Sequence, residues 1–133
     1  RLDWSLGERV DAAIVELGAN DALRGLPPEE ARANLDAILE NLADRGIPVL
    51  LAGMRSPPNL GPEYRAAFEP IYPDLAEKHG TLLYPFFLDG VAADASLNQA
   101  DGIHPTAEGV QVIVERIAPF VEDLIGRVQA RAR

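Results

Sequence analysis

Three short segments of the chain are apolar over almost their whole length. They are residues 12–17, 48–54 and 81–87, and each is soon followed by glycine, proline or polar residues. A continuous apolar run of this length is typical of a strand that is buried on both faces of a parallel sheet. The pattern therefore predicts three buried strands.

An amphipathic segment separates the first two of these strands. Residues 29–45 place Ala31, Leu35, Ile38 and Leu42 at helical spacing, with two glutamates at the start of the segment. Acidic residues in a first turn complement the partial positive charge of a helix N-terminus. We therefore predict a helix that lies against the sheet along this apolar stripe.

Two further helices are predicted after the second and third strands. Residues 63–80 carry apolar and aromatic side chains at helical spacing, and Pro70 and Pro73 should kink or interrupt that helix. From Thr106 onward a long apolar stripe is formed by Val110, Ile113, Val114, Ile117, Val121 and Leu124. The last helix should use this stripe to cover the sheet.

The order of these elements defines the fold class. Strand, helix and strand joined by short connections imply parallel crossovers and an α/β fold with a parallel sheet. The 133 residues, of which 47% are hydrophobic, suit one domain with a core of its own. Three strands make a thin sheet and the first begins by residue 12, so we expect residues 1–133 to be the C-terminal segment of a domain whose first strands are missing.

Composition and charge narrow the classes of function. The formal net charge is −9 and the basic residues form no stripe that could follow a phosphate backbone, so nucleic acid is not expected as a partner. The chain has no cysteine, which excludes a thiolate nucleophile and cysteine-ligated metals but leaves the compartment open. No stretch reaches the roughly 20 apolar residues that span a bilayer, so no membrane span is expected.

Candidate chemistry gathers in the loops that follow the strands. In open α/β sheets, ligands bind outside the carboxyl ends of the strands. Here the corresponding loops are residues 18–26, 55–62 and 89–105. We expect all three loops to meet at one edge of the sheet.

The third loop contains an acid and a base three residues apart. Asp101 and His104 flank Gly102 directly before the last helix, and a carboxylate on one ring nitrogen would leave the other nitrogen to face a substrate. Asp-Gly and His-Pro are also common turn dipeptides, so the same residues could form only a turn and a helix cap. A metal-binding Asp-x-x-His pair is a third alternative, although no companion ligands are evident.

The first loop offers a neutral hydrogen-bond donor. Gly18 ends the first strand where the backbone must turn, and Asn20 follows it with a side-chain amide suited to a developing oxyanion. The alternative is an ordinary turn in which Asp21 caps a short helix. The two motifs together are far more specific than either alone.

At this point the chain resembles the SGNH or GDSL-type hydrolases. Residues 14–21 (IVELGAND) are similar to the third conserved block of that family, and residues 101–105 (DGIHP) are similar to the fifth. The stretches 23–25, 54–64, 71–73 and 84–87 resemble the bacterial multifunctional acyl-thioesterases and lysophospholipases that are often called arylesterases.

The resemblance implies a fold, a reaction and roles for residues. The fold would be a flavodoxin-like three-layer α/β/α sandwich with a parallel sheet, here without its first strands. Asp101 and His104 would be the acid and base of a catalytic triad, and Asn20 would belong to the oxyanion hole. The substrate would be a small-molecule acyl ester or thioester, no cofactor or metal would be needed, and the family suggests a periplasmic or secreted location.

The resemblance fails at the nucleophile. Family members begin with a strand and a Gly-Asp-Ser block that carries the serine, and neither that block nor the second block is present. The hydroxyl-bearing alternatives are Ser5, Ser56, Ser96, Thr81 and Thr106. Ser56 follows a strand, but the next residue is Pro57, which has no N–H for an oxyanion. Ser5 precedes the first strand, Ser96 lies in an irregular loop, and Thr106 is expected to cap the last helix.

The serine is therefore expected to come from outside this chain. One partner would be an N-terminal segment of the same enzyme, present as a separate chain, and another would be a second copy that associates through the exposed sheet edge. The isolated chain should then be inactive. Two alternatives stay open: a catalytically silent α/β binding module, and a carbohydrate acetylesterase on the same fold.

Several loop residues are candidates for substrate binding. Apolar loop side chains suit fatty acyl chains, and arginines nearby could contact an anionic group of the substrate. The predicted set is Gly18, Leu23, Arg24, Arg55, Pro58 and Phe87. Ordinary loop packing is the alternative for each of them.

Overall fold

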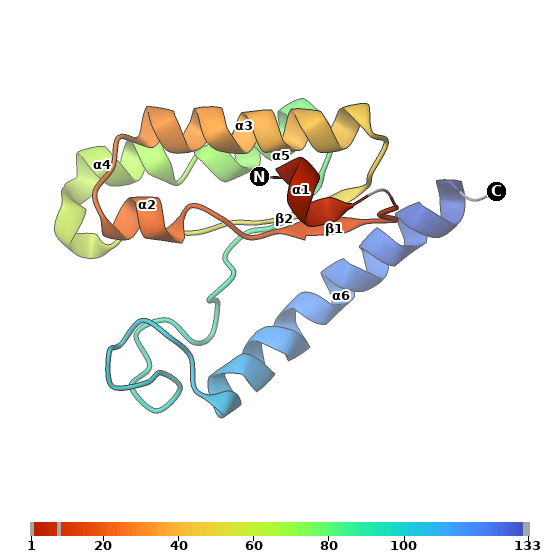
Figure 1. The fold of residues 1–133 in the computed structure, drawn as a ribbon. Coiled ribbons are helices and arrows are strands. Elements are labelled where there is room, and N and C mark those ends of the chain that lie inside the picture. Colours follow the sequence, from red (N-terminus) through yellow and green to blue (C-terminus); the bar gives the residue numbers. More distant parts are fainter. Residues whose placement is uncertain (1, 8, 132–133) are drawn as a thin grey trace.

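The computed structural model describes residues 2–7 and 9–131 as a three-layer α/β arrangement (Figure 1). The elements are α1 (Leu2–Leu6), β1 (Ala13–Val15), α2 (Ala19–Leu23), α3 (Pro28–Asp44), β2 (Val49–Ala52), the 3-10 turn η1 (Pro58–Leu60), α4 (Gly61–Phe68), α5 (Ile71–His79), β3 (Leu82–Tyr84) and α6 (Ala107–Arg131). Among the described residues no helix is long and apolar enough to cross a membrane.

The sheet has the predicted parallel strands. Its order is β1-β2-β3, and both pairs are parallel, with Ile14 opposite Leu50 and Leu50 opposite Leu82. Each strand is shorter than its apolar run. The runs include residues that lead into the sheet or leave it without ladder pairing, such as the exposed Leu17, so apolarity alone overestimates strand length.

One face of the sheet carries the larger part of the core. Figure 1 shows α3, α4 and α5 above the strands. The helix predicted over residues 29–45 is confirmed as α3, which begins at Pro28. Proline suits this position because a first-turn N–H has no partner within the helix. Three fully buried aliphatic side chains of this layer are Leu39, Leu42 and Ile71.

The predicted interruption of the next helix is also confirmed. The segment divides into α4 and α5, and Pro70 is the N-cap residue of α5. Proline cannot donate an N–H to the preceding turn, so the first helix ends just before it. Gly80 ends α5 in the left-handed region with φ 65°, as a C-terminal glycine commonly does.

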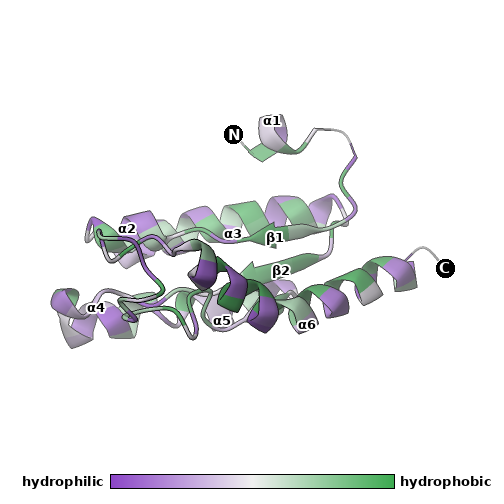
Figure 2. Cartoon of the chain, turned by 90° about the horizontal axis from the view of Figure 1, so that it is seen from below, coloured by the Kyte–Doolittle hydropathy of each residue, from purple (hydrophilic) through white to green (hydrophobic). Residues whose placement is uncertain are grey.

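Among the described residues, the helix that covers the other face is α6, which packs on β2 and β3. Leu50, Tyr84 and Leu124 form a buried cluster there. Ile14 points to the same face because it is the register partner of Leu50, yet 49% of its surface is exposed. Figure 2 shows α1 beyond β1 and α6 away from it, so this part of the face is uncovered.

Candidate active site

The loops after the three strands lie at the same end of the sheet, as predicted, although no backbone hydrogen bond joins the first loop to the third among the described residues. In Figure 1 they lie at the left, opposite the C-terminal end of α6. The loops after β2 and β3 are joined by backbone hydrogen bonds, because Gly53 N–H donates to Tyr84 O and Phe87 N–H donates to Gly53 O. A side chain at Gly53 would overlap the Pro85 carbonyl oxygen, so glycine permits this close approach.

The acid and base of the third loop are in direct contact. The Nδ1 atom of His104 lies 2.6 Å from Oδ2 of Asp101. In the tautomer that donates this bond, Nε2 is the ring atom left for a substrate. The His104 side chain is 69% exposed, so that atom is accessible. The pair has the geometry of a general base held by a carboxylate.

The second oxygen of the same carboxylate forms the turn. Oδ1 of Asp101 accepts the backbone N–H groups of Ile103 and His104 at 2.9 and 3.0 Å. Asp101 thus forms the predicted turn through Oδ1 and the contact with the His104 ring through Oδ2. The cap is not formed by Asp101, because Thr106 Oγ1 accepts the N–H of Gly109 and starts α6, as the sequence predicted for Thr106.

Hydrogen bonds within the third loop hold the segment around His104. The N–H of Gln99 donates to His104 O at 2.8 Å, and its side-chain amide donates to Pro105 O. The amide of Asn98 donates to the carbonyl oxygens of Val91 and Asp94. The histidine backbone is therefore held from both sides.

The Asp101 carboxyl group should titrate unusually low. Its hydrogen bond to the His104 side chain, followed by those from the Ile103 and His104 N–H groups, lowers its pKa from 3.8 to about 2. The ionised carboxylate therefore stabilises the folded state fully above pH 3.8, and this stabilisation is lost as the pH falls through about 2. A carbon-13 NMR titration should give this midpoint, and His104→Ala should raise it. An ordinary midpoint in the unsubstituted chain would contradict the described contact.

The first loop presents Asn20 from a tight turn. Gly18 has φ 105° and precedes α2, so Asn20 lies in the first turn of that short helix with an exposed side chain. The hydroxyl of Tyr72 donates to Leu17 O at 2.7 Å, and a side chain at Gly18 would overlap this hydroxyl. Tyr72 on α5 therefore determines where the turn lies.

Asn20 and the Asp101–His104 pair lie at the same end of the sheet without touching. Among the described residues, no hydrogen bond joins the Asn20 side chain to either of them. The two groups lie on different loops, Asn20 on the loop after β1 and the pair on the loop after β3. Asp21, considered as a cap, lies inside α2, whose N-cap residue is Gly18.

The predicted substrate-binding residues differ in their surroundings. Leu23 is 48% exposed at the end of α2, next to Arg24. Pro58 begins η1, and Arg55 lies over the Phe86 ring, with Cζ 4.6 Å from its centroid. Phe87 packs against the larger core cluster, which favours the packing alternative for this residue.

The serine hydroxyls of the described residues are hydrogen-bonded elsewhere, buried, or on an element away from the third loop. Ser96 Oγ donates to Asp94 at 2.6 Å. Ser56 is 6% exposed, and among the described residues its Oγ has no hydrogen-bond partner. Ser5 lies on α1, remote in sequence and structure from the third loop. Within the part of the chain that the structure covers, no hydroxyl donates to His104.

Two residues that support the site were not predicted from the sequence. Tyr72 was predicted on a helix and Phe86 in a strand, each within a stretch that resembles the family, but neither was given a role in the site. The role of each comes from a partner that a local pattern does not report, Leu17 for Tyr72 and Arg55 for Phe86. No group of three or more acidic, histidine or cysteine side chains suited to a metal occurs among the described residues.

The chain is similar in sequence and structure to known proteins. Residues 1–112 match the GDSL-like Lipase/Acylhydrolase family. The chain is 40% identical over 126 residues to Esterase TesA of Pseudomonas aeruginosa, covering 94% of this chain and 63% of that protein. It is 37% identical over 112 residues to Thioesterase 1/protease 1/lysophospholipase L1 of Escherichia coli strain K12, covering 84% of this chain and 54% of that protein.

Solved structures agree with this match. A crystal structure of AlinE4, described as a SGNH-hydrolase family esterase, is 51% identical with a TM-score of 0.73, covering 92% of this chain and 67% of that one. The crystal structure of TesA has a TM-score of 0.80 at 38% identity, with 86% of this chain and 63% of that one covered. The chain thus spans between about half and two thirds of the length of these relatives.

Proposed function

Because the chain belongs to the GDSL-like lipase/acylhydrolase family, whose matched members include esterases and thioesterases, we propose that it contributes to a serine hydrolase of carboxylic esters or thioesters. Residues 1–133 would supply the base, the acid and one oxyanion donor of the site. The observation that carries the proposal is the 2.6 Å contact of His104 Nδ1 with Asp101, which leaves the other ring nitrogen accessible.

The proposed reaction is acyl transfer through a covalent intermediate. His104 Nε2 takes the proton of a serine hydroxyl as that oxygen attacks the acyl carbonyl, and the bond to the leaving oxygen or sulfur breaks as His104 returns the proton. Asp101 holds the imidazole and stabilises its charged form. Asn20 donates to the carbonyl oxygen while it is negatively charged. Water then repeats the sequence on the acyl-enzyme and releases the acid.

We place the serine on a segment outside residues 1–133. Two observations support this assignment: the hydroxyl groups of the described residues lie away from His104 or are buried, and β1 has only β2 as a neighbour in the described sheet. The exposed Ile14 next to that edge, with Val110 and Val114 exposed on α6, provides an apolar surface for such a segment.

The substrate class follows from the loops and from the relatives. Leu23 and Leu26 are 48% and 36% exposed beside Asn20, which suits an aliphatic acyl chain. The Escherichia coli relative carries thioesterase and lysophospholipase in its name. Arg55, fixed over Phe86, is positioned to contact an anionic part of a leaving group.

Labelling with a fluorophosphonate probe tests where the serine resides. Residues 1–133 alone should not be labelled. When they are produced together with the serine-bearing part of the Pseudomonas aeruginosa esterase, that segment should be labelled and p-nitrophenyl ester hydrolysis should appear.

Three results would contradict the proposal. They are labelling of the isolated chain, a reconstituted complex without hydrolysis, and hydrolysis that survives His104→Ala. The other arrangement is self-association of residues 1–133 through β1. Size-exclusion chromatography of the isolated chain tests it, because self-association would give a dimer without any added segment.

A further inference from the structure

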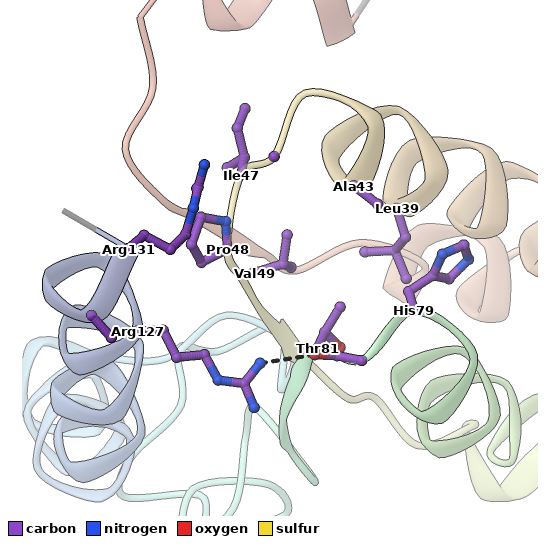
Figure 3. Close-up of a pocket in the computed structure, with 12 residues that line it drawn as sticks. Leu39, Ala43, Ile47, Pro48, Val49, His79, Thr81, Arg127 and Arg131 are labelled. Carbon is purple, nitrogen blue, oxygen red and sulfur yellow. Dashed lines mark hydrogen bonds between the residues drawn. The ribbon is translucent and has the colours of Figure 1, made fainter. Parts of the chain in front are cut away.

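A pocket lies at the opposite end of the sheet from His104. Its volume is about 440 Å³, and it is formed where β2 and β3 begin and α6 ends (Figure 3). The lining residues are Leu39, Ala43, Gly46, Ile47, Pro48, Val49, His79, Gly80, Thr81, Arg127, Ala130 and Arg131. None of these residues has a role in the proposed hydrolysis, so the pocket is a separate feature.

Two arginine side chains line one side of this pocket. Figure 3 shows Arg127 and Arg131 reaching in from α6, across from Leu39 and His79. Nη1 of Arg127 donates to Gly80 O at 2.8 Å, which fixes the guanidinium and leaves its other N–H groups available. Nη2 of Arg131 lies 3.0 Å from the position a side-chain carbon would take at Gly46, so glycine makes room for it.

These two arginines differ from others in the chain. Arg32 and Arg116 each form an ion pair with an aspartate, at 3.1 and 2.8 Å. Within residues 2–7 and 9–131, neither Arg127 nor Arg131 has a carboxylate partner. Two such cations on one helix, in a chain of formal net charge −9, mark the pocket as a place for an anion.

A buried hydroxyl gives an independent indication of a ligand. Thr81 Oγ1 has almost no exposed surface and, among the described residues, no hydrogen-bond partner. Buried hydroxyl groups are nearly always hydrogen-bonded. Asp36, whose carboxylate contacts the lining residue His79, is also paired with Lys78, so its negative charge is compensated and does not oppose an anion.

The remaining walls of the pocket are aliphatic. Leu39, Ile47 and Val49 belong to the buried core and form its inner surface, with Ala43 and Pro48 beside them. An inorganic anion would leave this apolar surface exposed to water, whereas a short hydrocarbon chain would bury it. The walls therefore select an anion with an apolar body.

We propose that this pocket binds an aliphatic carboxylate, with the carboxylate at Arg127, Arg131 and Thr81 and the chain along Leu39, Ile47 and Val49. Arginine suits this head group because its planar N–H groups match both carboxylate oxygens. The site is independent of the serine chemistry and is present in residues 1–133 themselves.

Titration of residues 1–133 with hexanoate, followed by amide NMR, tests the proposal. The amides of Gly46, Gly80 and Thr81 should shift and saturate. Arg127→Gln with Arg131→Gln should weaken binding at least about tenfold, as expected when charge-assisted hydrogen bonds are lost. Arg116→Gln removes the same charge from the same helix near the other end, and it should leave the dissociation constant unchanged.

Thr81→Val separates a ligand contact from a structural role. Valine has the shape of threonine without the hydroxyl, so the variant should raise Tm, because no unpartnered polar atom is buried, and should weaken hexanoate binding severalfold. The proposal is overturned if hexanol or phosphate binds as tightly as hexanoate, if Arg116→Gln weakens binding as much as the double variant, or if the three amides do not shift.

Discussion

Replacement of His104 by alanine should abolish ester hydrolysis in the enzyme that contains residues 1–133 and its serine-bearing segment. We expect kcat to fall by on the order of 10⁴- to 10⁶-fold, the range for loss of a triad base. The reason is that His104 Nε2 is the proposed acceptor of the serine proton. Binding of substrate uses other residues, so KM should change far less than kcat.

Asp101→Asn tests the same site without removing the base. The asparagine oxygen can still accept the turn N–H groups that Asp101 Oδ1 accepts, so the loop should persist. Its amide cannot stabilise a charged imidazole, and kcat should fall by about 10⁴-fold. Asp94→Asn, which removes a carboxylate of the same loop that contacts Ser96, is the matched control and should leave kcat within about threefold. A comparable loss in Asp94→Asn would show that the effect is structural.

The exposure of His104 is what distinguishes it from the other histidine. His79 lies 2.6 Å from Asp36, the same distance as His104 from Asp101. Its side chain is only 9% exposed, and it lies at the opposite end of the sheet. A short contact with a carboxylate does not by itself distinguish the two histidines, and it is the added exposure at the carboxyl end of the strands that favours His104 as the proposed base.

Replacement of Tyr72 by alanine should be the most destabilising change on the core side of the site. The residue is 1% exposed and its ring packs edge-on against Phe68, with centroids 5.8 Å apart. Removing a buried aromatic ring typically costs about 3–5 kcal/mol of unfolding free energy. Urea denaturation of residues 1–133 measures this loss as a lower midpoint.

Tyr72→Phe isolates the hydrogen bond to Leu17 O. The ring is retained, so the expected cost is about 1 kcal/mol for the lost bond and the unpaired carbonyl. Burial also raises the pKa of Tyr72, so the hydroxyl remains a donor in ordinary buffers. Tyr64→Phe is the matched control, because Tyr64 donates to Leu26 O at the same 2.7 Å in an exposed position and should cost less. Equal losses in the two phenylalanine variants would contradict a special role for Tyr72 at the turn.

The sequence determined most of the fold because its elements have local signatures. Apolar runs marked β1, β2 and β3, and the stripe over residues 29–45 marked α3. Pro70 divided α4 from α5 as expected, since a missing N–H acts within one turn. The Asp101–His104 contact was also predictable, because the two residues are three positions apart on a turn that contains Gly102.

Only the tertiary structure decided what depends on partners distant in sequence. It placed Tyr72 against Leu17, and it left Ile14 uncovered although Leu50 beside it is fully buried. It also brought Arg127 to Gly80 and Arg131 to Gly46. Periodicity shows that a side chain is apolar or polar and which face of its element it occupies. It does not show which other element will cover that face, because that depends on how helices and strands far apart in the chain pack together in space.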